Sequence, residues 1–108
     1  MKNYKEEKIA ELMKSLAADF LQKESNRTAL ITVTRVLISD NLKSAKILFT
    51  VLPEEKEEQA LQFAKRQIRD FRDFVKEKAR IRTIPFFSFE IDLGEKNRQK
   101  IDALGINT

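Results

Sequence analysis

The stretch ALITVTRVLISDNLKSAKILFTVL, residues 29–52, decides the fold class. Residues 29–38 and 46–52 are rich in β-branched and aliphatic side chains, which favours two strands. Residues 39–41, a serine, an aspartate and an asparagine, are typical of a turn. Two strands joined by so short a connection predict an antiparallel hairpin. The apolar pattern changes phase at Arg35, which predicts a β-bulge in the first strand.

Helical patterns precede and follow this hairpin. Apolar residues recur at the 3.6-residue period over residues 3–24, with Asn3 placed as the N-cap. A second helical pattern begins after Pro53 with four glutamates, which suit the positive end of a helix dipole, and continues to about Arg80. Because this length is unusual for one helix, we expect a kink or break inside it.

A third strand and a short closing helix complete the order. Residues 84–92 alternate between apolar and polar side chains, as a strand with one buried face does. Residues 95–104 form the predicted last helix, with Gly105 placed for its C-cap. The order α-β-β-α-α-β, followed by the short helix, predicts one α+β domain over residues 1–108, a three-stranded sheet with helices packed on one face. This is the order of the type II KH fold, an RNA-binding architecture.

The composition argues against catalysis. The chain has 108 residues without His or Cys, so the usual general base, disulfides and Cys/His zinc sites are excluded. Two glycines are too few for a P-loop or a dinucleotide fingerprint. Asp40 and Asp92 end predicted strands, where carboxylates more often serve as turn or capping residues than as Mg²⁺ ligands. We expect no enzyme, no cofactor, no metal and no small-molecule substrate, and a Mg²⁺-dependent hydrolase is the least favoured alternative.

No apolar run approaches the roughly 20 residues that cross a bilayer. The first residues are charged and lack the apolar core of a signal peptide. We therefore expect a cytoplasmic protein with no membrane partner.

The positive charge is concentrated in one segment. The whole chain has a net charge of +4, whereas residues 60–82 contain eight Lys or Arg and three acids, a net charge of +5. On one continuous helix, five of these cations would form a basic ridge beside the apolar stripe; they are Lys65, Arg69, Arg72, Lys76 and Arg80. Such a ridge can neutralise consecutive phosphates of a nucleic acid, and a solvated charged face is the alternative.

Further cations could widen this ridge into a larger RNA-binding patch. The additional candidates are Arg66, Arg82, Arg35, Lys43 and Lys46. Arg66 is also spaced for an i,i+4 ion pair with Asp70 on a continuous helix.

The phenylalanines divide into two groups. Phe71 and Phe89 lie on apolar faces and are predicted core residues. Phe63, Phe74 and Phe86 lie off these faces; burial is the usual position of a phenylalanine, but an exposed ring among them could stack on a base. An exposed Phe63/Phe74 patch would instead favour the alternative function, a protein–protein interaction module of a ribonucleoprotein complex with no direct RNA contact.

Four segments together carry a resemblance to a known family. They are VTRVLISDNL (residues 33–42) with AKI (45–47) following, AKRQIR (64–69), RIRTIPFFSF (80–89), and Asp92 followed by a late helix that ends in Leu104. In this order and spacing the chain resembles ribosome-binding factor A, a bacterial assembly factor of the small ribosomal subunit.

The resemblance implies a monomeric RNA-binding factor for late maturation of the small (30S) subunit and processing of 16S rRNA, linked to growth in the cold. Its implied partners are small-subunit rRNA and free 30S subunits. Arg66 stands where the family usually has a kink-forming glycine, which leaves open whether the two helices meet at a sharp angle. The segment from Arg69 to Pro85 is about one helical turn longer than expected for the family. The helix that contains Arg69 is therefore expected to project further from the domain.

Overall fold

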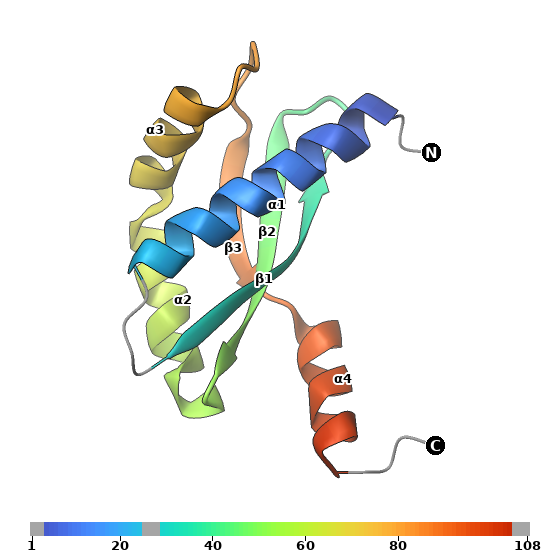
Figure 1. The fold of residues 1–108 in the computed structure, drawn as a ribbon, viewed down its shortest axis with the longest axis vertical. Coiled ribbons are helices and arrows are strands. Elements are labelled where there is room, and N and C mark those ends of the chain that lie inside the picture. Colours follow the sequence, from blue (N-terminus) through green and yellow to red (C-terminus); the bar gives the residue numbers. More distant parts are fainter. Residues whose placement is uncertain (1–3, 25–28, 105–108) are drawn as a thin grey trace.

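The computed structural model describes residues 4–24 and 29–104 (Figure 1). Its elements are α1 (Tyr4–Glu24), β1 (Leu30–Ile38), β2 (Ser44–Leu52), the 3-10 turn η1 (Glu54–Lys56), α2 (Glu57–Arg66), α3 (Ile68–Lys78), β3 (Phe86–Ile91) and α4 (Leu93–Leu104). The predicted order of strands and helices is confirmed. The predicted caps Asn3 and Gly105 lie outside the described residues, as do residues 25–28.

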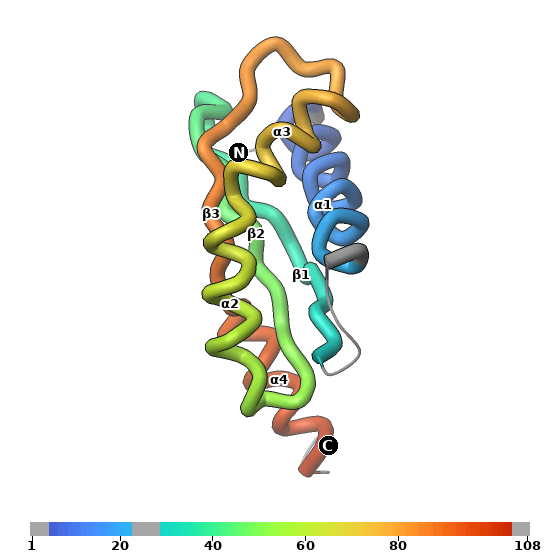
Figure 2. Tube along the Cα trace, turned by 90° about the vertical axis from the view of Figure 1, so that its left-hand side faces the viewer, coloured from blue at the N-terminus to red at the C-terminus, as the bar shows by residue number. Residues whose placement is uncertain are grey.

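The three strands form one mixed sheet in the order β1-β2-β3. β1 and β2 are antiparallel, as the hairpin predicted, and β3 lies parallel to β2. Alternate residues of β2, among them Ile47 and Phe49, point into a core that α1, α2 and α3 complete. α4 leaves the lower end of the sheet, where Lys96 pairs with Glu57 at the start of α2 (Figures 1 and 2). The α+β, type II KH-like prediction is therefore correct.

The predicted bulge lies in β1. Val33 is opposite Phe49 and Arg35 is opposite Leu48, so Thr34 is the extra residue. The extra residue shifts the alternation, which allows both Val33 and Val36 to be buried although they are three residues apart.

Aromatic side chains fill the centre of the core. Phe71 of α3 is fully buried, and its ring centroid lies 4.8 Å from that of Phe87 and 5.5 Å from that of Phe89. On the other side Phe71 meets Phe20 of α1 at 5.3 Å. Phe71 and Phe89 are thus confirmed as core residues. Burial of one such ring contributes about 2–3 kcal/mol of transfer free energy.

The expected helix break lies at Gln67, where φ is −93° and ψ is 3°. The Gln67 N–H donates to the carbonyl oxygen of Ala64 at 3.0 Å, and the Gln67 carbonyl accepts from the N–H of Phe71 at 2.8 Å. α2 packs on β2 and β3, whereas α3 packs on α1 and β3. The two halves have different packing partners, so Arg66 at the position of the family's glycine does not remove the break.

α3 ends earlier than the sequence pattern predicted. Ala79 is extended (φ −102°, ψ 140°), and residues 79–85 form an irregular loop before β3. The helix therefore ends at Lys78, slightly before the Arg80 that the sequence pattern indicated. Ile81 and Ile84 pack against the core, which turns the chain back towards the sheet. No helix within the described residues has both the length and the apolar character to cross a membrane.

Candidate nucleic-acid interface

The predicted basic ridge is divided between three elements. Lys65 lies in the last turn of α2, Arg69, Arg72 and Lys76 lie on α3, and Arg80 follows α3 in the loop. The break at Gln67 and the end of α3 interrupt the row of cations. Four of these five side chains are nevertheless exposed, whereas Arg72 is half-buried.

Most of the candidate cations are available for an external anion. Within residues 4–24 and 29–104, eight of the ten form no ion pair, namely Lys43, Lys65, Arg66, Arg69, Arg72, Lys76, Arg80 and Arg82. The predicted pair of Arg66 with Asp70 is absent, since the break at Gln67 removes the i,i+4 geometry that it required.

Arg72 serves the fold instead. Its side chain is half-buried, and Nη1 donates to the carbonyl oxygen of Pro85 at 2.9 Å and to that of Ile84 at 3.4 Å. The guanidinium carbon also lies 5.6 Å from the centroid of the Phe86 ring, within cation–π range. Arg72 thus ties the end of the loop at 79–85 to α3.

Arg35 and Lys46 project from the sheet and have carboxylate partners. Arg35 Nε lies 3.2 Å from Asp92 Oδ2, and Lys46 Nζ lies 3.5 Å from Glu90 Oε2. Lys46 alternates with buried residues of β2 that face the helices, so it lies on the opposite face of the sheet from α3. The ten candidates therefore do not form a single patch.

Three phenylalanines were predicted to lie off the apolar faces, and one of them, Phe86, is exposed. Its side chain is 77% exposed at the start of β3. Phe63 and Phe74 are half-buried, and the Phe74 ring centroid lies 5.5 Å from that of Phe20. Phe86 and Arg72 together form a small aromatic–guanidinium surface, which the sequence alone did not indicate as a pair.

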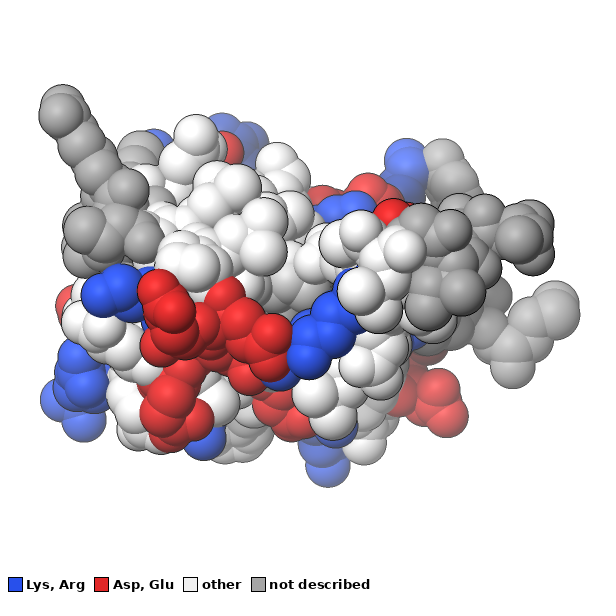
Figure 3. Space-filling model, turned by 90° about the horizontal axis from the view of Figure 1, so that it is seen from below, with Lys and Arg blue, Asp and Glu red and all other residues white. Residues whose placement is uncertain are grey.

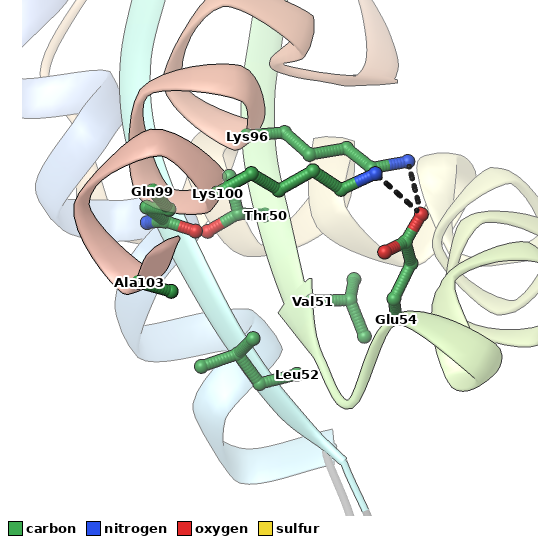
Figure 4. Close-up of a pocket in the computed structure, with 8 residues that line it drawn as sticks. All are labelled: Thr50, Val51, Leu52, Glu54, Lys96, Gln99, Lys100 and Ala103. Atoms are coloured by element: carbon green, nitrogen blue, oxygen red, sulfur yellow. Dashed lines mark hydrogen bonds and ion pairs between the residues drawn. The ribbon is translucent and has the colours of Figure 1, made fainter. Parts of the chain in front are cut away.

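The lower end of the molecule is acidic. Glu54, Glu55 and Glu58 are exposed where η1 and α2 begin, and Figure 3 shows carboxylates gathered on this end. Lys96 and Lys100 of α4 both bind one oxygen of Glu54, at 3.2 and 3.1 Å (Figure 4). Hydrogen bonds and charge from Lys100 and Lys96 lower the pKa of Glu54. These two lysines are therefore committed to holding α4 at this end.

Asp92 joins β3 to α4. It is buried, and its Oδ1 accepts from the backbone N–H of Glu95 at 3.1 Å, the capping role expected from the sequence. Its Oδ2 accepts from Thr34 Oγ1 at 2.6 Å and from Arg35 Nε at 3.2 Å. Burial alone would raise the pKa of Asp92, but the hydrogen bonds from Thr34, Glu95 and Arg35 and the Arg35 charge lower it overall.

The role of Thr34 was missed from the sequence. The bulge places Thr34 as the extra residue of β1, and its hydroxyl reaches the Asp92 carboxylate just after β3. The phase change at Arg35 was the only available signal, and it gave no partner. Within the described residues, no cluster of three or more Asp or Glu side chains could hold a metal ion.

Comparisons with known proteins agree on one family. The model of the family "Ribosome-binding factor A" matches residues 5–105. Two relatives are named ribosome-binding factor A. The protein of Geotalea daltonii is 28% identical over 101 residues, which cover 91% of this chain and 82% of the relative. The protein of Natranaerobius thermophilus is 27% identical over 107 residues, which cover 96% of this chain and 82% of the relative.

Solved structures agree with the fold. The crystal structure of ribosome-binding factor A from Thermus thermophilus superposes with a TM-score of 0.67 at 23% identity, covering 76% of this chain and 90% of that one. The solution structure of a putative ribosome binding factor A from Thermotoga maritima gives 0.67 at 22% identity, covering 83% and 89%.

A third similar structure is a homology model of the Thermus thermophilus protein, which was fitted into a cryo-electron microscopy map of a complex of the 30S subunit with ribosome-binding factor A. It superposes with a TM-score of 0.66 at 23% identity and covers 74% of this chain and 87% of that one. These neighbours share the three-stranded KH-like fold. Since the family model spans nearly the whole chain, this chain belongs to the ribosome-binding factor A family.

Proposed function

We propose that this chain is a cytoplasmic, monomeric RNA-binding factor that docks on the free 30S subunit during its late maturation and supports 16S rRNA processing. Family membership supports a ribosomal partner. The Thermus thermophilus protein has been fitted into a map of its complex with the 30S subunit, which supports the small subunit as that partner.

One observation carries the proposal for RNA contact. The cations without a carboxylate partner, within the described residues, include Lys65, Arg66, Arg69 and Lys76 along α2 and α3. Each can neutralise a phosphate and release condensed counterions, which favours binding at low salt. A guanidinium can also make bidentate contacts with phosphate oxygens.

The arrangement of charge also favours one orientation on the RNA. The acidic end at Glu54, Glu55 and Glu58 would be repelled by phosphates, whereas α3 and the loop after it would be attracted. An uneven charge distribution of this kind steers association. We propose that α2, α3 and the loop at 79–85 face the rRNA and that the end with Glu54 faces solvent.

Phe86 adds a contact of another kind. An exposed ring backed by a guanidinium offers a surface on which an unpaired base can stack, with little preference for sequence. Phosphate contacts would fix the position of the protein, and the shape of the folded rRNA would supply specificity.

Sedimentation tests this proposal. The tagged protein is expected to cosediment with free 30S subunits and not with complete ribosomes, and cells lacking it are expected to accumulate unprocessed 16S precursor. A protein that sediments alone at low salt with purified 30S subunits would contradict the proposal.

A direct protein contact is the second candidate function, and α4 favours it. Leu93, Ile101 and Leu104 of α4 are 64%, 48% and 73% exposed, and exposed apolar side chains on one element are typical of partner sites. The predicted support from a Phe63/Phe74 patch is weaker than expected, because both rings are half-buried. Binding to 30S subunits that does not weaken with added salt would favour this candidate.

A further inference from the structure

A cleft lies where α1, the β1–β2 turn and the loop at 79–85 meet. The start of α1, the β1–β2 turn and the loop at 79–85 all lie at the upper end of the molecule in Figure 1. The cleft has a volume of about 330 Å³, within the size range of small-molecule sites. Its lining residues are Lys5, Ile9, Leu42, Arg80, Ile81, Arg82, Thr83 and Pro85.

The cleft combines an apolar floor with a basic rim. Pro85 is fully buried, and Ile9 and Ile81 are half-buried against the core. The exposed lining side chains include Lys5, Arg80 and Arg82, and there is no carboxylate among the eight lining residues. None of these three cations makes an ion pair within the described part of the chain.

Leu42 contributes to the floor from a disfavoured backbone conformation. Its φ is 60°, in the left-handed region that side chains bearing a Cβ rarely adopt. The turn enforces this conformation: the Leu42 N–H donates to the carbonyl oxygen of Ser39 at 2.9 Å, and the Lys43 N–H donates to Ser39 Oγ and Asn41 Oδ1 at 3.1 and 3.0 Å. Strain of this kind is concentrated at functional sites, and here it holds a leucine side chain in the cleft.

The opposite wall is also held in place. Phe86 N–H donates to the carbonyl oxygen of Lys43 at 2.9 Å, and Arg72 binds the carbonyl oxygen of Pro85. The loop that carries Arg80 and Arg82 is thus anchored both to the β1–β2 turn and to α3, which fixes one side of the cleft.

We propose that this cleft holds one unpaired nucleotide of the RNA, with the base against Ile9, Leu42 and Pro85 and its phosphates against Lys5, Arg80 and Arg82. This inference rests on the proposed function. A nucleotide matches the site because it joins a flat, weakly polar ring to an anion, whereas an acidic peptide would bring charge without a group for the apolar floor.

The site is separate from the junction at Ala64–Gln67, which lies at the other end of α3. The cleft would bind a base that is turned out of the stacked RNA strand, whereas the cations of α2 and α3 would contact the RNA phosphates. Lys5 was not among the residues that the sequence indicated, because only the fold brings the start of α1 next to the loop.

The test follows the methyl groups of Ile9, Leu42 and Ile81 by NMR in the full chain. The probes are the tetranucleotide rAAAA, its abasic analogue with the same phosphates, and hexaglutamate. We expect methyl shifts with rAAAA alone. Equal shifts with the abasic analogue would show that the cleft contacts phosphates alone, which would overturn the proposal. Shifts with hexaglutamate would show that the cleft binds acidic peptides instead. The absence of shifts with every probe would also overturn the proposal.

A variant that fills the cleft sharpens the test. Thr83 is an exposed lining residue, so Thr83→Trp is expected to fold normally and to weaken rAAAA binding at least about 5-fold, a loss of the size expected for one stacked base. Asn97→Trp, on the exposed side of α4, is the matched control and is expected to bind as the unmodified chain does. If the unmodified chain binds 30S subunits but Thr83→Trp changes neither rAAAA nor 30S affinity, the cleft proposal alone fails. If the unmodified chain does not bind 30S subunits, the proposed function fails.

Discussion

Arg72 of α3 donates a 2.9 Å hydrogen bond to the carbonyl oxygen of Pro85, the last residue before β3. This bond crosses the loop at 79–85 and joins a candidate RNA-binding segment to the core. The half-buried guanidinium would therefore act on the proposed RNA surface indirectly, through the position of Arg80 and Arg82.

Arg72→Gln is expected to lower the free energy of unfolding by about 1–2 kcal/mol, because a charged donor to two backbone carbonyls is lost. The exchange rate of the Phe86 amide, which bonds Lys43, is expected to rise with it. Urea unfolding and hydrogen exchange measure both effects. Arg69→Gln removes the same charge from an exposed site and is expected to change stability by less than about 0.5 kcal/mol; equal losses in the two variants would refute the anchoring role.

The ionisation of Asp92 makes the free energy of unfolding depend on pH in the acid range. Its pKa is lowered in the folded protein from an ordinary value of 3.8, so the folded state binds fewer protons than the unfolded state near that pH. The stabilisation by the carboxylate is therefore complete above the ordinary pKa and is lost as the pH falls through the lower, folded pKa.

We expect Asp92→Asn to cost about 1–3 kcal/mol of unfolding free energy at neutral pH, because a buried carboxylate that accepts three hydrogen bonds is replaced. The difference from the unmodified chain should shrink as the pH falls below 3.8. Asp40→Asn, an exposed aspartate that also follows a strand, is the control. A difference that does not vary with pH would rule out the charge as the cause.

The break at Gln67 is held by packing, so a glycine is not needed there. Arg66→Gly and Arg66→Ala both remove one exposed cation and are expected to weaken 30S binding equally. The glycine variant is expected to be less stable by about 0.5–1 kcal/mol, the usual cost of glycine in a helix. Tighter 30S binding by the glycine variant than by the alanine variant would show instead that Arg66 restricts the angle between α2 and α3.

Phe86→Ala tests stacking on a base. Since the ring is 77% exposed, we expect little change in thermal stability. Loss of one stacked base is expected to weaken 30S binding by roughly 5- to 100-fold, from about 1–3 kcal/mol per base. Leu52→Ala, an exposed apolar residue at the end of β2 next to the acidic end, serves as the control and is expected to bind as the unmodified chain does. Unchanged affinity in Phe86→Ala would exclude stacking at this ring.

Local pattern was sufficient for most of the fold. The strands of the hairpin, the bulge near Arg35, the break in the long helix and the capping role of Asp92 all depend on side chains close in sequence. The end of α3 was mispredicted because the charged pattern continues past Lys78, whereas packing of Ile81 and Ile84 on the core turns the chain. Long-range contacts of this kind leave no periodic signal.

The candidate site was less predictable for the same reason. Sequence spacing placed Arg72 in a row with Arg69 and Lys76, but its length and position allow it to reach two carbonyls of a loop more than ten residues away. Arg35 likewise has its partner at the end of a strand distant in sequence. Whether a cation is free for a phosphate depends on such contacts, and only the folded chain brings them together.

The salt dependence of 30S binding tests the central claim most directly. The variant Arg69→Gln with Lys76→Gln removes two exposed cations of α3, and Lys56→Gln with Lys100→Gln removes two charges from the acidic end. We expect the first pair to reduce the slope of log affinity against log salt concentration by roughly 1.5, and the second to leave it unchanged. Equal slopes for both pairs and the unmodified chain would contradict phosphate contact by α3.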